Sequence, residues 1–181
     1  MTLHTSICDI FGIEKPVVLA GMGGASGPAL AAAVSNAGGL GILGAAACGP
    51  AQLRQWIRET RALTDKPFGV DTLLPASVRR ASYDAQEGPT PSDLLPERLE
   101  FAQAFMRKEG LEPVTAKDLE ERSVPGEPAI FTKEFFEAQM QVVIEERVPV
   151  YASGLGNPGP WMADLRANGT KVMAVIGAVR H

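Results

Sequence analysis

The stretch PVVLAGMGGASGPALAAAVSNAGGLGIL, residues 16–43, decides the fold. It begins with a continuously apolar run, passes through four glycines within residues 21–27, becomes alanine-rich and ends in a second apolar run. Apolar runs without polar alternation are typical of strands buried on both faces of a parallel sheet. Gly27 followed by Pro28 indicates a helix start, and Gly38 indicates its end. We therefore predict a strand, a glycine loop, a helix and a second strand.

The same order recurs along the rest of the chain. Further buried strands are predicted from apolar runs at residues 66–71, 148–153 and 171–176. Helices are predicted to begin at Pro50, Thr132 and Asn157, and Thr132 would cap its helix. The helix from Pro50 would have one apolar face, formed by Leu53, Trp56, Ile57 and Leu63. Strands that alternate with helices indicate an α/β fold, here with five predicted strands.

A polar, proline-rich stretch at residues 75–130 interrupts this order after the third predicted strand. It contains one predicted helix, from Glu97 to Glu109, which has Phe105 on its inner face and ends at Gly110. Insertions after a barrel strand usually lie over the active-site face. A solvated surface excursion is the alternative, and the sequence favours neither interpretation over the other.

Composition restricts the classes of partner. The chain has 181 residues and a net charge of −4, which argues against nucleic acid. No apolar run approaches the roughly 18 residues that span a bilayer, and the N-terminus does not resemble a signal peptide. Cys8 and Cys48 have no metal-ligand spacing and are expected to be buried hydrophobes in a reducing cytoplasm. We expect a cytoplasmic protein with a small-molecule ligand and no metal, nucleic acid or membrane partner.

The two histidines, His4 and His181, stand at the ends of the chain. The interior therefore lacks an imidazole for a Ser-His-Asp triad, a zinc site or a histidine acid–base step. This pattern leaves the catalytic residues unknown.

The glycine loop suggests a ligand. Four glycines within residues 21–27 are costly in chain entropy, unless a flat molecule packs on the backbone with Met22 as a polarizable contact. A flexible turn is the alternative. Asp71 ends a predicted strand, where parallel barrels place their sites. Ser153 also ends a strand and is either a ligand donor or a turn former.

The segment Gly154–Gly159 spells GxGxxG between a predicted strand and a predicted helix. A dinucleotide site also needs an acidic residue about 20 positions later to hold a ribose. None is found there, and a tight strand-to-helix turn is therefore the favoured interpretation.

Three blocks carry a family resemblance: residues 16–43, residues 148–181 and the shorter Phe68-Gly69-Val70-Asp71. In these blocks the chain resembles the nitronate monooxygenase family, also called 2-nitropropane dioxygenases, whose members are FMN-dependent TIM-type (β/α) barrels. Such a barrel needs roughly 200–250 residues. The resemblance implies that residues 1–181 form the N-terminal part of one barrel domain. That part is an incomplete barrel of about five of eight strands, with residues 75–130 as an insertion after strand three.

The resemblance also implies a flavin site. The FMN-contacting positions would be Ala20, Gly21, Met22, Gly23, Asp71 and Val175. Family members commonly have Ala-Pro-Met at residues 20–22, often Asn at position 71, and in some cases Lys at position 175. The family's catalytic histidine and its phosphate-binding glycines would follow residue 181. We therefore expect residues 1–181 alone to be inactive.

The implied reaction is oxidation of an alkyl nitronate, or of the parent nitroalkane, to a carbonyl compound and nitrite, with FMN and O2. Two alternatives remain: an FMN-dependent enoyl-thioester reductase, and a non-catalytic half-barrel that a second polypeptide completes. A requirement for reduced nicotinamide would separate the reductase from the nitronate monooxygenase. Flavin retention by the isolated chain would separate the nitronate monooxygenase from the half-barrel. We also expect self-association through the open sheet edges.

Overall fold

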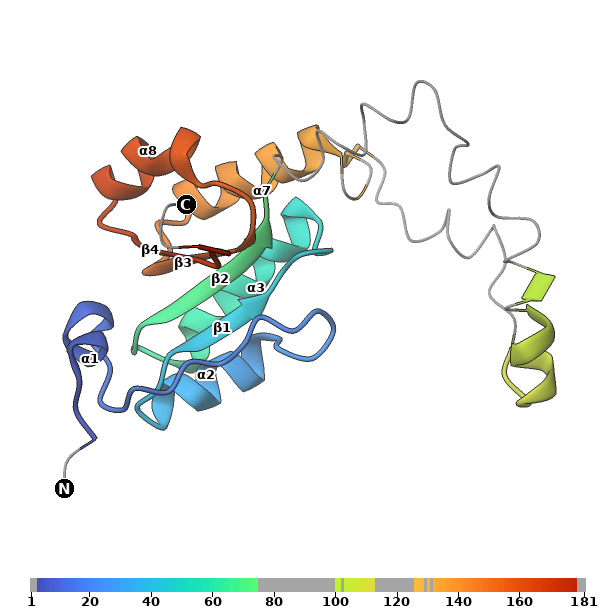
Figure 1. Ribbon diagram of the computed structural model, residues 1–181, viewed down its shortest axis with the longest axis horizontal. Coiled ribbons are helices and arrows are strands. Elements are labelled where there is room, and N and C mark those ends of the chain that lie inside the picture. The colour runs from blue at the N-terminus through green and yellow to red at the C-terminus, as the bar shows by residue number, and fades with distance from the viewer. Residues whose placement is uncertain are drawn as a thin grey trace. The chain divides into compact units, whose positions relative to one another are not determined.

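The computed structural model describes residues 3–74, 100–101, 103–112, 126–128, 130 and 132–178. The chain forms two compact units, one of residues 1–77 with 128–181 and one of residues 78–127. The first unit holds a single parallel sheet and the helices that connect its strands (Figure 1).

The sheet has four strands in the order β1-β2-β3-β4, all parallel. Their bounds are Gly41–Gly44 for β1, Phe68–Leu73 for β2, Val150–Leu155 for β3 and Lys171–Ala174 for β4. In a (β/α) barrel, parallel strands follow one another in chain order and each is joined to the next through a helix, so this sheet corresponds to part of such a barrel. The predicted α/β fold and the partial barrel are therefore confirmed.

The first predicted strand, at residues 15–20, is reduced to an isolated parallel bridge between Val18 and Leu40. Two hydrogen bonds hold it, from the Leu19 N–H to the Leu40 carbonyl at 2.9 Å and from the Leu40 N–H to the Val17 carbonyl at 2.9 Å. Pro16 has no N–H to extend this ladder. The expectation of a fifth full strand was wrong, although the segment does lie alongside β1 in the direction expected.

Helices α2, α3 and α7 lie at Pro28–Asn36, Pro50–Leu63 and Lys133–Glu145. They begin where predicted: Pro28 and Pro50 stand at first-turn positions, and the Thr132 hydroxyl accepts the Phe135 N–H at 3.2 Å. Leu63 was predicted on the buried face of α3, but it is 53% exposed because it lies in the last turn.

Two further elements differ from the predictions. The segment after Asn157 forms a short 3₁₀ helix, η1, at Gly159–Trp161, followed by α8 at Met162–Ala167. The Asn157 side chain accepts the Gly159 N–H at 2.9 Å, forming a turn instead of capping α8. Helix α1, at Ser6–Phe11, was not predicted because its six residues are too short for a periodic pattern.

The core lies on both faces of the sheet. On one face, Leu43, Val70 and Tyr151 pack with buried residues of α3, α7 and α8, including Leu53, Ile57, Met140, Val143 and Leu165. On the other face, Ile42 and Val150 form a smaller cluster with Leu40, Cys8 and Ile13. We call this second face the inner face. Cys8 belongs to α1, so this short helix covers the inner face near the amino ends of the strands and leaves their carboxyl ends open.

In the second unit, residues 100–101 and 103–108 are helical, and Gly110 at φ +70° ends the turn as predicted. Phe105 was predicted on an inner face, but it is 54% exposed. The first part of the predicted helix, residues 97–99, lies outside the described residues. Within the part of the chain that the structure describes, no helix has the length and apolarity needed to cross a membrane.

Candidate functional site

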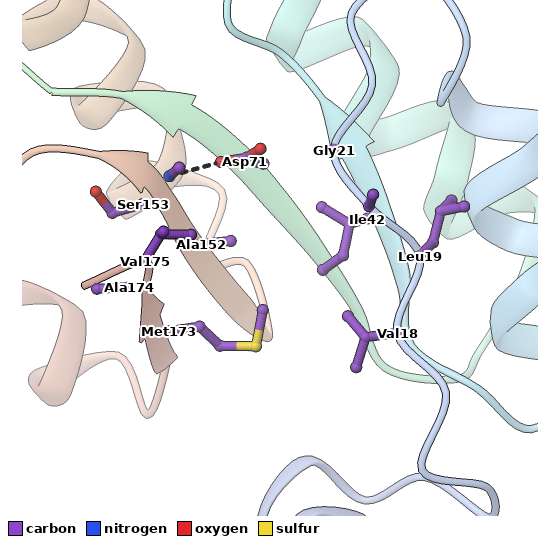
Figure 2. Close-up of a pocket in the computed structure, with 12 residues that line it drawn as sticks. Val18, Leu19, Gly21, Ile42, Asp71, Ala152, Ser153, Met173, Ala174 and Val175 are labelled. Carbon is purple, nitrogen blue, oxygen red and sulfur yellow. Dashed lines mark hydrogen bonds between the residues drawn. The ribbon is translucent and has the colours of Figure 1, made fainter. Parts of the chain in front are cut away.

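A pocket of about 500 Å³ lies on the inner face of the sheet, toward the carboxyl ends of the strands (Figure 2). It is lined by Val18, Leu19, Ala20, Gly21, Ile42, Asp71, Ala152, Ser153, Gly154, Met173, Ala174 and Val175. These residues come from all four strands, from Val175 just after β4, and from the bridged segment, which is the stretch at residues 17–24 that pairs with Leu40 through Val18. The lining is apolar except at Asp71 and Ser153, as expected for a site that binds a largely apolar molecule and orients it with few polar groups.

Asp71 is the one ionisable side chain among the residues that line the pocket. Its Oδ1 accepts a hydrogen bond from the Gly154 N–H at 2.9 Å, shown as the dashed line in Figure 2. Burial raises the pKa of the carboxyl from 3.8 to about 6, although the hydrogen bond from Gly154 opposes the shift. Asp71 therefore changes its charge near pH 6, about two pH units above an ordinary aspartate.

Gly21 lies directly beside this carboxyl. A Cβ atom on residue 21 would overlap Oδ2 of Asp71 and lie 2.5 Å from its Cβ. A Cβ on Gly154 would lie 2.9 Å from Oδ1, so the Asp71 carboxyl sits between two glycines. The absence of both side chains leaves the space that the carboxyl occupies.

Sequence reasoning missed Ser26, which organises the glycine loop. Its hydroxyl accepts the Met22 N–H at 2.6 Å and lies 3.0 Å from the Met22 carbonyl and 3.2 Å from the Ala20 carbonyl. Ser26 is 1% exposed, and its carbonyl accepts the Gly44 N–H at 3.0 Å. Ser26 therefore ties the loop to the end of β1. A serine in a glycine-rich loop gives no signal of this role, because such residues are common in ordinary turns.

The six residues proposed for the flavin separate into two groups. Ala20, Gly21, Asp71 and Val175 line the pocket. Met22 and Gly23 do not: the Met22 side chain is 42% exposed, and open space surrounds the Cβ position of Gly23. The apolar wall formed by Ile42 and Met173 was missed, because apolar strand residues are normally assigned to the core.

Other sequence candidates have structural roles. The Ser153 hydroxyl donates to the Gly156 carbonyl at 3.0 Å, so its side chain forms the turn. Gly156 has φ +99°, which supports the interpretation of Gly154–Gly159 as a tight turn. His4 pairs with Asp9 at 2.8 Å beside α1 and does not line the pocket. His181 lies outside the described residues.

The pocket fits the ring part of a flavin. Its apolar walls suit an aromatic ring, and Asp71 offers one polar partner whose Oδ2 has no hydrogen-bond partner among the described residues. No cationic side chain lines the pocket, so these residues do not account for the phosphate of FMN. Among the described residues, no cluster of three or more His, Cys, Asp or Glu is placed to hold a metal ion.

The sequence of the chain matches a known family. The family model for nitronate monooxygenase matches residues 4–181. The chain belongs to the nitronate monooxygenase family. The family's fold is a TIM barrel, in agreement with the parallel sheet and its connecting helices.

Individual relatives match parts of the chain. The nitronate monooxygenase of Paraburkholderia phytofirmans is 54% identical over 68 residues, covering 38% of this chain and 19% of that protein. A (3aS,4S,5R,7aS)-5-hydroxy-7a-methyl-1-oxo-octahydro-1H-indene-4-carboxyl-CoA dehydrogenase of Rhodococcus jostii is 45% identical over 95 residues, covering 45% of this chain and 27% of that protein.

Among solved structures, FabK of Thermotoga maritima superposes with a TM-score of 0.62 at 32% identity. The match covers 98% of this chain and 39% of FabK. The chain therefore spans less than half the length of the family members that it matches here.

Proposed function

We propose that the chain forms the ring-binding part of an FMN-dependent oxidoreductase that oxidises alkyl nitronates, or their parent nitroalkanes, to a carbonyl compound and nitrite with O2. The observation that carries the proposal is the apolar pocket at the strand ends, with the Asp71 carboxyl between Gly21 and Gly154. Membership of the nitronate monooxygenase family supports the reaction class. When bound, FMN would supply the electron transfer to O2.

The residues of this chain would hold and orient the ring. The backbone of Ala20 and Gly21 would form one wall, Val175 on the segment after β4 would form the other, and Asp71 would contact the edge of the ring. Met22 and Gly23 remain proposed contacts, which require the glycine loop to turn toward the pocket. Gly23→Val tests the contact proposed for Gly23. A valine side chain has space there in the structure, so a loss of flavin binding with unchanged circular dichroism would indicate that the ring contacts this residue.

Residues 1–181 are expected to bind flavin weakly and to lack turnover. No imidazole lines the described pocket, and no cationic side chain in it could anchor the phosphate. The test is nitrite release from propyl-2-nitronate by the purified chain with excess FMN, with FMN alone as the blank. Nitrite at the blank level is expected, together with weak quenching of flavin fluorescence. Nitrite well above the blank would contradict the expected inactivity, and the absence of flavin binding would contradict the site.

A second candidate is an FMN-dependent oxidoreductase that acts on a thioester. The Rhodococcus jostii relative supports it, because its name gives a carboxyl-CoA substrate at 45% identity over 95 residues. Assays on a longer chain that forms a closed barrel would distinguish the two candidates. Oxidation of reduced nicotinamide that depends on an enoyl thioester would favour the second, and nitrite release without nicotinamide would favour the first.

A further inference from the structure

The two oxygens of Asp71 have different surroundings. Oδ1 is fixed by the Gly154 N–H at 2.9 Å. Oδ2 lies against Gly21, where the missing side chain leaves it room, and it has no hydrogen-bond partner among the described residues. The carboxyl is therefore held in one orientation, with one oxygen free for a ligand in the pocket.

No cationic side chain among the described residues forms an ion pair with this carboxyl. The bridged segment at residues 17–24 and strand β1 present no ionisable side chain to it. On β3 the nearest titratable group is Tyr151, which is fully buried with its hydroxyl 2.8 Å from the Thr72 hydroxyl, and burial raises the pKa of this phenol. On β4, Lys171 is exposed at the strand start and forms no ion pair with Asp71.

A flat ligand in this pocket would remove water from Oδ2. An ionised carboxylate that loses its water without gaining a cation or a donor is strongly disfavoured, and such groups take up a proton instead. The protonated form then becomes a hydrogen-bond donor at Oδ2. Nitrogen and carbonyl acceptors on the edge of a flavin ring are suitable partners for that donor.

We propose that Asp71 binds the flavin ring as a neutral carboxylic acid, whose Oδ2–H donates a hydrogen bond to an acceptor on the edge of the ring. The proposal rests on the proposed flavin site and adds the protonation state in which it binds. Ring binding and proton uptake at Asp71 are then coupled. The pKa of about 6 in the free chain agrees with this proposal, because burial already favours the protonated form of Asp71 before a ligand binds.

The competing arrangement is an ionised Asp71 that accepts an N–H of the ring. The two arrangements predict opposite pH dependence. A neutral acid weakens binding as the pH rises above the pKa of Asp71, by as much as tenfold per pH unit. An ionised acceptor weakens binding as the pH falls, and takes up no proton when the ring binds at pH 8.

Riboflavin is the appropriate probe, because it lacks a phosphate that itself titrates near pH 6. Riboflavin at a low, fixed concentration is titrated with the chain of residues 1–181 to about 1 mM, so that weak binding is detected, at pH 5 to 9 by quenching of the riboflavin fluorescence. Calorimetry at pH 8 in two buffers of different ionisation enthalpy counts the protons taken up. The matched variant is Asp71→Asn, which has the same shape, keeps an amide donor in place of the protonated oxygen and cannot titrate.

For the wild-type chain we expect uptake of close to one proton at pH 8 and a dissociation constant that rises steeply between pH 7 and 9. For Asp71→Asn we expect no proton uptake and little change over the same range. Wild-type binding that is flat with pH, or tighter at high pH, would overturn the proposed protonation state while leaving the flavin site intact. The absence of riboflavin binding to both variants, with their circular dichroism intact, would overturn the flavin site and this inference with it.

Discussion

The Asp71 carboxyl occupies the space that a side chain on Gly21 would fill. Oδ2 of Asp71 overlaps the Cβ position of residue 21, and the two residues lie on neighbouring segments on the inner face of the sheet. Gly21 cannot gain a side chain unless Asp71 moves. The pair therefore fixes the shape of one wall of the pocket.

We expect Gly21→Ala to destabilise the chain by about 1–3 kcal/mol, because the new methyl group forces Asp71 from its place. Gly21 does not have a positive φ, so the substitution adds no backbone strain of its own. Gly23→Ala is the matched control: it also lacks a positive φ, has no atom within 4 Å of its Cβ position and is expected to be neutral or slightly stabilising. Urea unfolding measures the free energy of unfolding of both variants. Equal values would show that Asp71 moves aside from the new methyl group without loss of stability.

Asp71→Asn is expected to stabilise the free chain at pH 8 and to have no effect near pH 3. The pKa of Asp71 is raised from 3.8 to about 6 in the folded chain, so between these values the folded state holds a proton that the unfolded state has lost. Stability therefore falls as the pH rises from about 4 to about 6, and the amide removes this loss. Since Asp71 is only half-buried and solvent screens its charge, the gain above pH 6 should be about 1 kcal/mol.

The measurement is the free energy of unfolding of both chains at several pH values. The difference between them should be small at low pH and should reach its full size by pH 7. A difference that is constant with pH would mean that the amide acts through packing and not through charge.

The sheet and the position of Asp71 were predictable because both depend on local patterns. Continuous apolar runs indicated strands β1 to β4, and a charge at the end of such a run indicated the open end of the sheet. The contact between Asp71 and Gly21 was not predictable. It depends on the register that places Asp71 beside Gly44 of β1, and register between segments distant in sequence leaves no local signal.

The reduction of the first strand to a bridge has a related cause. An apolar run at residues 15–20 indicates burial, but it does not show whether a partner strand lies on each side. Val18 pairs with Leu40, and Pro16 cannot donate a hydrogen bond to extend the ladder. The cap at Thr132, by contrast, was predictable because it depends on only three neighbouring residues.

Ser26→Ala is expected to lower riboflavin affinity several-fold. The hydroxyl holds the Met22 N–H at 2.6 Å and keeps the loop that carries Ala20 and Gly21 against the pocket. Loss of a buried hydroxyl that satisfies backbone groups also costs about 1–3 kcal/mol in stability. Affinity and unfolding must therefore be measured together.

Ser35→Ala provides the matched control for that effect. Ser35 is also 1% exposed, and its hydroxyl accepts the Gly41 N–H at 3.0 Å and donates to the Pro67 carbonyl at 2.8 Å. It lies at the amino ends of β1 and β2, opposite the pocket. We expect a similar loss of stability from both variants but weaker riboflavin binding only from Ser26→Ala. Equal losses of affinity would show that Ser26 supports the fold in general and not the site.

The outer edge of the sheet should cause the chain to self-associate. Strand β4 pairs only with β3 in the described sheet, and the segment that follows exposes Val175 by 73% and Ile176 by 55%. An unpaired apolar edge is a template for pairing with another chain, and a charged side chain there opposes it. Ile176→Lys should therefore shift the chain toward monomer, measured by sedimentation velocity at several concentrations. The control is Leu63→Lys, which replaces an equally exposed side chain, at 53%, at the end of α3 away from this edge. If both lysines reduce association equally, general solubility explains the effect, and a wild-type chain that is monomeric throughout would show that the edge is protected.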